Sequence, residues 1–232
     1  MENKIDLTVL IPTLNEKDNI IHLIPKVRTI ISALMNNYEI VVIDGGSEDG
    51  TIEAATSLGA KIVIQRLEGY GGALKDGFEY AKGRYILTLD ADLSHDPKFI
   101  KSMWEKRHDA KIVIGSRYIP GGAARMPATR KILSIILNVC FSKILSLPVK
   151  DLSSGFRLYH KHILEEITLE GTNFEILEEV LIKCYALGHK ISEVPFTYIP
   201  RESGRSKAKL IKFGFALLKT LVKMRRLRNS IS

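Results

Sequence analysis

Apolar residues in the first half of the chain form short continuous runs that alternate with segments in which they recur at helical spacing. The short runs predict strands at Leu7–Ile11, Ile40–Ile43, Lys61–Ile64, Tyr85–Leu89 and Ile112–Ile114. The segments between them predict helices at Lys17–Met35, Thr51–Leu58, Ala73–Ala81 and Pro97–Trp104. This alternation favours an α/β fold, a mostly parallel sheet with helices on both faces.

The C-terminal part has a different pattern. Val194–Pro200 predicts an edge strand closed by proline, and the glycine, serine and cations that follow predict a loop able to close over a diphosphate. Residues 209–228 predict a helix with an apolar face and a lysine-rich face. We therefore expect a catalytic domain over residues 1–204 and a basic amphipathic helix over 205–232. That helix could lie on an anionic membrane or pack on the domain's own core.

The positive charge of the chain is concentrated in this same tail. The net charge is +8, and residues 201–228 hold ten Lys/Arg against one acidic residue, Glu202. These cations are interleaved with aliphatic residues instead of stacking aromatics, which disfavours nucleic-acid binding. No signal peptide is visible, and Ile132–Val149 is too polar to span a membrane. Cys140 and Cys184 fall in predicted helices without Cys-x-x-Cys spacing. We therefore expect a soluble or peripheral protein in a reducing compartment.

The strand predicted at Tyr85–Leu89 ends in two carboxylates, Asp90 and Asp92. Residues at i and i+2 share one side of an extended segment, and the end of such a strand is the usual place for a ligand crevice in an open α/β sheet. Hard oxygen ligands suit Mg²⁺ or Mn²⁺, which take the rest of their shell from water and a diphosphate. The pattern indicates a metal clamp for a nucleotide diphosphate; a solvated strand end is the alternative.

Other predicted strand ends also carry polar residues. Pro12 is expected to end the first strand's hydrogen bonding, and Asn15 or Glu16 to cap the next helix or reach into the crevice. Asp44 can accept from a ribose hydroxyl or a base N–H. Gly69–Ala73 opens a helix whose N-terminus could receive phosphate, although a tight turn explains the glycines equally well.

Six weak motifs occur in a fixed order and together resemble a known family. They are Pro12-Thr-x-Asn15-Glu16, Asp44-x-x-Ser47-x-Asp49-Gly50-Thr51, Gly71-Gly-Ala73, Asp90-Ala-Asp92, Gly115-Ser-Arg117-Tyr118 and Asp151-x-Ser-Ser-Gly155-Phe-Arg157. The set is similar to the inverting family 2 glycosyltransferases, and within them to dolichyl-phosphate mannose synthases and other polyprenyl-phosphate glycosyltransferases. The resemblance covers the chain up to about Lys207. It implies the GT-A fold, a nucleotide-sugar donor, a divalent metal and a polyprenyl phosphate acceptor.

The resemblance also implies roles for individual residues, with Asp92, Arg117 and Arg130 at the centre of catalysis. Asp90 and Asp92 would hold Mg²⁺ or Mn²⁺, with Asp90 also at the donor. The nucleotide would bind at Pro12, Thr13, Glu16 and Asp44, the donor diphosphate at Arg201 and Lys207, and the acceptor phosphate at Arg117, Arg130 and Ser134. A carboxylate near the sugar would be Glu175 or Glu178. His95 could ligate metal, but next to Asp96-Pro97 it is interpreted as a helix-start residue.

Two positions depart from the pattern of the mannose synthases. Gly46 stands where an acidic residue of the base-recognition site is usual, and Ser94 stands where a metal-ligating Gln is often found. Mannose from GDP-mannose is the leading donor, with UDP-glucose or UDP-N-acetylglucosamine as alternatives. A degenerate protein that binds nucleotide and lipid without turnover is the competing class.

The expected chemistry needs no enzymic base, because a phosphate monoester with a second pKa of about 6 is already a dianion at neutral pH. The site then has to hold two anionic groups together and neutralise the leaving diphosphate. We expect such a transferase to act on dolichyl or polyprenyl phosphate as a cytoplasmic protein, peripheral on the cytoplasmic face of a membrane.

Overall fold

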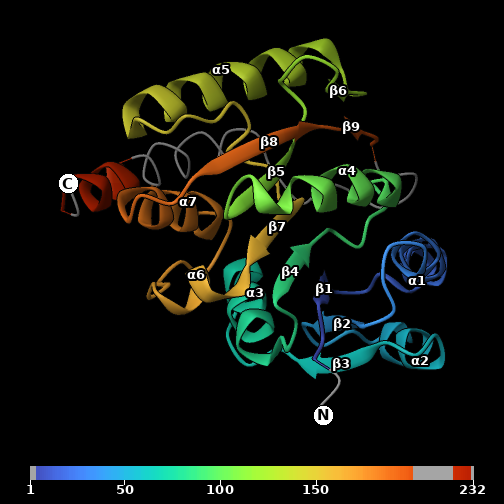
Figure 1. Cartoon of the computed structure of the whole chain (residues 1–232). Coiled ribbons are helices and arrows are strands. Elements are labelled where there is room, and N and C mark those ends of the chain that lie inside the picture. Colours follow the sequence, from blue (N-terminus) through green and yellow to red (C-terminus); the bar gives the residue numbers. More distant parts are fainter. Residues whose placement is uncertain (1–3, 201–221, 231–232) are drawn as a thin grey trace.

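The computed structural model describes residues 4–200 and 222–230, and in this part a seven-stranded mixed sheet has the order β3-β2-β1-β4-β7-β5-β8 (Figure 1). Its strands are β1 Leu7–Thr13, β2 Tyr38–Asp44, β3 Lys61–Ile64, β4 Tyr85–Thr88, β5 Ile112–Ser116, β7 Arg157–His160 and β8 Ile191–Pro195. The first four strands in the chain run parallel, β7 is antiparallel to β4 and β5, and β8 is parallel to β5. A two-stranded sheet pairs β6 Ala123–Ala124 with β9 Thr197–Tyr198.

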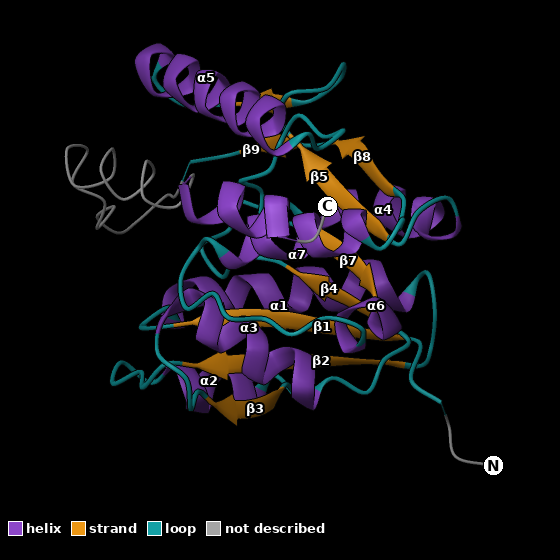
Figure 2. Cartoon of the chain, turned by 90° about the vertical axis from the view of Figure 1, so that its left-hand side faces the viewer, coloured by secondary structure: helices purple, strands orange, loops and turns teal. Residues whose placement is uncertain are grey.

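Helices cover both faces of the large sheet (Figure 2). α1 Lys17–Ser32, α2 Thr51–Ser57 and α4 Ile100–Glu105 contribute to the core on one face. α3 Gly69–Tyr80, α5 Ala128–Leu145 and α7 Ile176–Ala186 contribute to the core on the other. The shorter helices are α6 Lys161–Glu165 and the 3₁₀ turns η1 Pro97–Phe99 and η2 Lys106–His108. The predicted mostly parallel α/β architecture is confirmed.

The two cores follow directly from the alternation of side chains along the strands. In β1, Val9 and Ile11 join the core under α1, whereas Leu10 joins the core under α3. Successive residues of a strand point to opposite faces, so a continuous apolar run fits a strand buried on both sides. This is why the apolar runs located the central strands correctly.

The prediction that Pro12 ends the hydrogen bonding of the first strand is wrong. β1 continues to Thr13, with Pro12 in register with Ile43 and Thr13 with Asp44. The β4 ladder reaches only Leu10, so beyond it β1 has a strand neighbour on one side. Proline is tolerated there because its missing N–H faces the side without a ladder.

The start of α3 is also earlier than predicted, at Gly69 instead of Ala73. The N–H groups of Gly71 and Gly72 donate to the carbonyl of Thr172 at 2.9 and 3.3 Å. A Cβ on Gly71 would lie 2.7 Å from the carbonyl oxygen of Gly171. These glycines let the first turn of α3 pack directly on the loop that precedes α7, a reason for glycine that no local pattern reveals.

The predicted edge strand Val194–Pro200 is two strands. β8 begins earlier, at Ile191, and lies at the edge of the large sheet, while β9 belongs to the small sheet. Phe196, fully buried, separates them. The chain therefore changes sheets at this point and brings Tyr198 next to the loop after β4, where Tyr198 forms an isolated bridge with His95.

The predicted helix at residues 209–228 and the domain boundary near residue 204 fall mostly outside the described residues. Residues 222–230 are helical, and Met224 is fully buried in the core shared by α3, α5 and α7. The described end of the tail thus packs on the domain. Cys140 and Cys184 lie on α5 and α7 as free thiols. Among the helices described here, none has the length and hydropathy needed to cross a bilayer.

Candidate active site

The carboxyl ends of β1, β2 and β4 meet at one edge of the sheet. Thr13 and Asp44 are register partners at the ends of β1 and β2, and β4, which leads into Asp90, pairs with the other side of β1. Parallel strands gather their carboxyl ends at the same edge, which is where ligands bind in open α/β sheets. The predicted nucleotide residues and the predicted metal residues are therefore neighbours.

Asp90 and Asp92 lie in the loop just after β4, as predicted. Asp92 is buried and its Oδ1 accepts from the Ser94 N–H at 3.1 Å. The Asp90 side chain is 36% exposed, and its Oδ1 accepts from the Tyr70 hydroxyl at 3.5 Å. One carboxylate is thus anchored in the loop while the other opens toward solvent.

The His95 side chain hydrogen-bonds to the backbone of this loop. Its Nδ1 accepts from the Asp90 backbone N–H at 3.0 Å, and its Nε2 lies 3.8 Å from Asp90 Oδ2. The ring is buried and stacks on Phe156 with centroids 5.1 Å apart. The interpretation of His95 as a helix-start residue is wrong, because Asp96 is the N-cap of η1. His95 orients the carboxylate loop, and since Nδ1 is an acceptor, the neutral ring carries its proton on Nε2.

The residues after β4 fit a hard divalent cation. The described residues contain no cluster of three or more His, Cys, Asp or Glu side chains arranged as ligands. Next to the two carboxylates, however, the buried hydroxyl of Ser94 has no hydrogen-bond partner in the described part of the chain. Mg²⁺ and Mn²⁺ accept one or two carboxylates and take the remaining ligands from water and substrate phosphate. Asp90, Asp92 and Ser94 supply a donor set of that kind.

An aromatic pair stands beside Asp90. Tyr70 stacks on Phe174 with centroids 4.6 Å apart, and the Phe174 side chain is exposed. Burial, and then the charge of Asp90, raise the pKa of Tyr70 well above its usual value, so its hydroxyl remains a donor. A Cβ on Gly155 would lie 2.6 Å from the Tyr70 hydroxyl oxygen. Glycine at 155 therefore gives Tyr70 room to reach the carboxylate.

Asp44 is fully buried and organises the loop that follows β2. Its Oδ1 accepts from the N–H groups of Gly46 and Ser47 at 2.9 and 2.7 Å. Its Oδ2 accepts from the hydroxyls of Thr13 and Ser47 at 3.1 and 2.6 Å. These four bonds hold the loop close to the end of β1. Direct contact of Asp44 with a nucleotide stays a prediction. The structure shows in addition that Asp44 positions the loop after β2, which the sequence did not indicate.

The capping prediction for Asn15 and Glu16 is wrong. Glu16 occupies the N-cap position of α1, but its side chain makes no capping bond and accepts instead from Asn19 Nδ2 at 2.5 Å. Asn15 Oδ1 accepts from the Glu48 N–H at 2.9 Å. The segment after β1 is thereby tied to the loop after β2. Pro12 and Glu16, half-buried beside it, remain candidates for nucleotide contact.

Arg117 is held by a buried carboxylate. Its Nε and Nη2 donate to the two oxygens of Asp151 at 2.7 and 2.6 Å, and Nη2 also donates to Ser153 Oγ at 2.7 Å. Burial by itself lowers the pKa of Arg117, but the hydrogen bonds to Asp151 and the charge of Asp151 together raise it above its usual value. The guanidinium lies 5.8 Å from the centre of the Tyr198 ring. Arg117 is thus a fixed cation joined through Tyr198 to the loop of His95.

Ser134 belongs to the same network. Its hydroxyl lies 2.6 Å from the Tyr118 hydroxyl, and its carbonyl accepts from Asn138 Nδ2, which also donates to Ser153 Oγ at 3.2 Å. Arg130 is exposed and precedes Ser134 by four residues, one turn of α5. The structure brings Arg117 and Ser134 together and leaves Arg130 on the adjoining surface. Arg201 and Lys207 lie outside the described residues.

A fully buried cation, Arg157 in β7, lies beneath the site. Its guanidinium donates to the carbonyls of Ser154 and Leu177 at 2.7 Å each and to the carbonyl of Leu152. These bonds tie the loop after Asp151 to α7. Arg157 ends the last of the six sequence motifs, but the motif did not indicate that its guanidinium would bind backbone carbonyls.

Glu175 and Glu178, the two candidates for a carboxylate near the sugar, lie in different environments at the start of α7. Glu175 is half-buried and accepts from the Thr172 N–H at 3.3 Å, whereas Glu178 is buried. Burial raises the pKa of Glu178 from 4.5 to about 7. Near neutral pH this group holds a proton much of the time, which distinguishes it from an ordinary carboxylate.

This shift predicts a pH-dependent stability. The pKa of Glu178 is about 7 in the folded chain and 4.5 when exposed, so the unfolded state ionises first. The free energy of unfolding should therefore fall as pH rises from 4.5 to 7, by about 3 kcal/mol. Glu178→Gln should flatten this decline, measured by urea unfolding at pH 4.5 and pH 8. The exposed Glu53→Gln serves as control, and an unchanged pH dependence in Glu178→Gln would contradict the assignment.

The glycosyl transferase family 2 model matches residues 8–168, more than half of the chain. A dolichol-phosphate mannosyltransferase of Pyrococcus furiosus is 37% identical over 214 residues, 88% of this chain and 59% of its own length. An undecaprenyl-phosphate mannosyltransferase of Micrococcus luteus is 31% identical over 213 residues, 85% of each chain. The glycosyltransferase AglJ of Haloferax volcanii is 31% identical over 84% of this chain and 64% of its length.

Among solved structures, glucosyl-3-phosphoglycerate synthase of Mycobacterium tuberculosis, in complex with Mn²⁺, UDP and phosphoglyceric acid, matches with a TM-score of 0.74. The two are 20% identical, and the match covers 95% of this chain and 78% of that one. At this identity the match shows the fold, which is the GT-A fold predicted from the motifs.

Proposed function

The chain belongs to glycosyltransferase family 2, and on that premise we propose that it transfers a sugar, with inversion, from a nucleoside-diphosphate sugar to a polyprenyl or dolichyl phosphate. Mannose from GDP-mannose is the proposed donor. The observation that carries the proposal is the link between two sites of opposite charge. The loop that carries the carboxylates after β4 reaches Tyr198 through the backbone bridge of His95. The guanidinium of Arg117 lies over the ring of the same Tyr198.

The residues divide the work by charge. Asp90 and Asp92, with Ser94, would hold the divalent cation, which when bound neutralises the leaving diphosphate. Thr13 and Glu16 line the end of β1 where the nucleotide would lie, and the loop organised by Asp44 shapes its other wall. We propose that Asp44 binds the nucleotide and also positions this loop against it.

The acceptor side is cationic. Arg130 and Arg117 would bind the acceptor phosphate, with Ser134 as an additional donor. Asp151 holds the Arg117 fork by two bonds and so fixes its orientation. Because the acceptor is a dianion at neutral pH, it can attack the sugar without a base. What the protein contributes is the approach of two anions that would otherwise repel each other.

A donor comparison tests the proposal. The purified chain is incubated with GDP-mannose, UDP-glucose or UDP-N-acetylglucosamine, a short polyprenyl phosphate, and Mg²⁺, Mn²⁺ or EDTA. We expect lipid-linked mannose with GDP-mannose in the presence of metal and none with EDTA. A product with a UDP-sugar alone would correct the donor. Nucleotide binding without a lipid product from any donor would instead favour the non-catalytic alternative.

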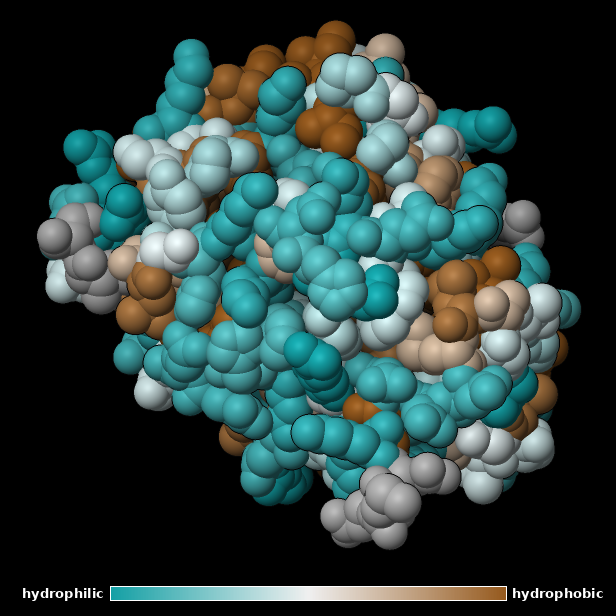
Figure 3. Space-filling model, viewed as in Figure 1, coloured by the Kyte–Doolittle hydropathy of each residue, from teal (hydrophilic) through white to brown (hydrophobic). Residues whose placement is uncertain are grey.

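A membrane-facing surface is the second part of the proposal. α5 exposes apolar side chains at spacings that place them along one side of the helix: Ile132, Leu133, Ile136, Val139 and Ile144. Figure 3 shows hydrophobic side chains gathered along the top of the molecule, over α5. Arg130 and Lys131 are exposed at the start of the same helix. We propose that α5 lies on the cytoplasmic face of a membrane, with Arg130 and Ser134 next to the headgroups.

Charged substitutions on α5 test this surface. Ile132→Asp with Ile136→Asp should lower co-sedimentation with phosphatidylglycerol vesicles at least about tenfold, because two apolar side chains leave the interface. Transfer to a short water-soluble phosphate acceptor should change little. Ile21→Asp, at an exposed apolar position of α1, is the matched control. Equal vesicle binding by the double variant and the control would reject α5 as the contact surface.

A further inference from the structure

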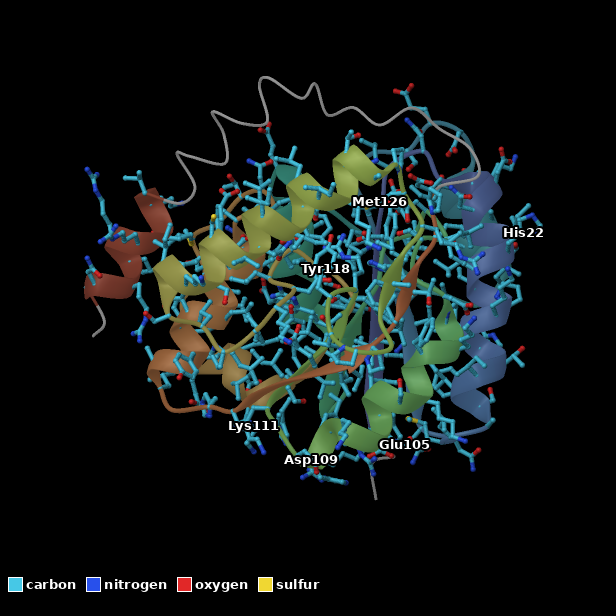
Figure 4. The ribbon with its side chains drawn as sticks, turned by 90° about the horizontal axis from the view of Figure 1, so that it is seen from above. His22, Glu105, Asp109, Lys111, Tyr118 and Met126 are labelled. Carbon is cyan, nitrogen blue, oxygen red and sulfur yellow. The ribbon has the colours of Figure 1, made fainter. Side chains whose placement is uncertain are left out.

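A basic cavity lies on the side of the sheet away from the candidate active site. It has a volume of about 260 Å³, and its lining residues are Arg84, Tyr85, Arg107, His108, Asp109, Ala110, Lys111, His160, Gly188, His189 and Lys190. Tyr85 begins β4 and Lys111 precedes β5, so the cavity adjoins the amino ends of these strands, whereas Asp90 and Arg117 follow their carboxyl ends. In Figure 4, Lys111 and Asp109 lie at the lower edge of the molecule, whereas Tyr118, which follows Arg117, lies above them within it.

The lining is strongly cationic. It contains four Lys and Arg side chains against one carboxylate, Asp109, and that carboxylate is already paired with Lys106 at 2.9 Å. A second acid, Glu166, adjoins the lining and binds His189 at 2.8 Å, with His162 at 3.6 Å. The face over this region is hydrophilic (Figure 3). Asp109 also attracts Lys190, and Glu166 attracts Lys111, so both acids offset part of the cavity's charge. With both acids counted, four Lys and Arg side chains still outnumber two carboxylates.

Backbone hydrogen bonds hold the cationic segments together. The Lys111 N–H donates to the Lys190 carbonyl, and the His160 N–H donates to the Lys111 carbonyl, each at 2.9 Å. The Lys161 N–H donates to the Arg84 carbonyl at 2.9 Å. Four segments distant in sequence are therefore fixed relative to one another. The positive charges converge because the fold brings these segments together.

The pKa of His160 is sensitive to the positive charges in this cavity. Burial lowers its pKa to about 4, and neighbouring His162, Lys111, Arg84 and His108 contribute in the same direction. An anion among these cations would offset their repulsion of a proton on His160, so the pKa should rise on binding.

We propose that this cavity binds a multivalent phosphate-type oxyanion. The volume is slightly below the roughly 300 Å³ at which small-molecule sites begin, which suits a compact anion. Arg84 can offer a forked pair of N–H donors. Arg107, whose Nη1 donates to the Trp104 carbonyl at 2.7 Å, can add donors from its remaining nitrogens, and Lys111 and Lys190 supply point charges. A concave, partly enclosed site loses less of this attraction to salt than scattered surface charges do.

Calorimetry with inorganic pyrophosphate and EDTA tests the site in the absence of divalent metal. We expect saturable binding to one site per chain, weakened at least about tenfold in Lys111→Gln/Lys190→Gln, because two of four cations are removed. Both substitutions keep the backbone bonds of these residues. Lys26→Gln, an exposed lysine on α1, should bind like the wild type. Asp92→Asn should also bind normally, which separates this site from the proposed metal and donor site.

The proposal would be overturned by an absence of saturable pyrophosphate binding together with unchanged vesicle flotation in the double lysine variant. Equal weakening of pyrophosphate binding by Lys26→Gln would also overturn it. An NMR titration of the His160 ring gives a second readout, with a pKa that rises when pyrophosphate is added. Flotation with phosphatidylglycerol vesicles distinguishes a lipid headgroup from a free anion. Flotation lost in the double lysine variant, without pyrophosphate binding by the wild type, would assign the phosphate chemistry to a lipid.

Discussion

Asp92→Asn is expected to lower sugar transfer by about 10³-fold, because one of the two carboxylates that would hold the cation loses its charge. The substitution is nearly isosteric, and its amide oxygen can still accept from the Ser94 N–H, which Asp92 Oδ1 accepts at 3.1 Å. The fold should therefore persist. Initial rates of lipid-product formation, measured over a series of Mg²⁺ and Mn²⁺ concentrations, give the effect and show whether excess metal restores it.

Asp18→Asn provides the control for this experiment, because Asp18 is an exposed carboxylate on α1, outside the candidate site. It should retain wild-type transfer. An Asp92→Asn enzyme that keeps activity within tenfold of the wild type would contradict the metal assignment. If that variant binds donor as tightly as the wild type but does not turn over, the carboxylate acts on the leaving diphosphate and not on donor affinity.

The sequence predicted the parts of the site that lie at strand ends. Apolar runs locate β1, β2 and β4, and the polar residues after them fall at one edge of the sheet because parallel strands end there. Asp90 and Asp92 could be found in this way. Their support could not, since His95 acts through its ring on the Asp90 backbone and Tyr70 reaches Asp90 from the start of α3.

Polar residues that serve the fold also resemble functional ones in sequence. Asp44 stands at a strand end, as a ligand would, yet its oxygens accept four bonds from Thr13 and the following loop. Arginine is the residue type expected at a phosphate site, but the structure shows that Nε and Nη2 of Arg117 already donate to Asp151. A pattern gives the residue and its element; only the three-dimensional structure gives the partner.

The apolar pattern likewise does not say what covers an apolar face. The tail was expected to lie on either a membrane or the core, and its described end, through Met224, packs on the core. α5, which was too polar to span a membrane, instead leaves Ile132 and Ile136 exposed at 57% and 52%. Helical spacing is the same in both cases, because the period depends on the backbone and not on the partner.

Arg157→Met should lower the free energy of unfolding by about 3–5 kcal/mol. The guanidinium is fully buried and satisfies the carbonyls of Leu152, Ser154 and Leu177. A methionine of similar length would remove this donor from three buried carbonyls, although the Leu177 carbonyl, in the first turn of α7, keeps its helical bond. Each carbonyl left without a donor costs about 1–3 kcal/mol, while removing a buried charge recovers part of that cost. Chemical denaturation followed by circular dichroism measures the difference.

Arg157→Lys separates the contribution of geometry from that of charge. A single ammonium keeps the charge but cannot present donors in the planar fork that reaches carbonyls from two elements, so we expect an intermediate loss of stability. Transfer activity should fall in both variants, since Arg157 ties the loop that holds Asp151, and through it Arg117, to α7. A methionine variant as stable as the wild type would mean that the loop and α7 hold together without this cation.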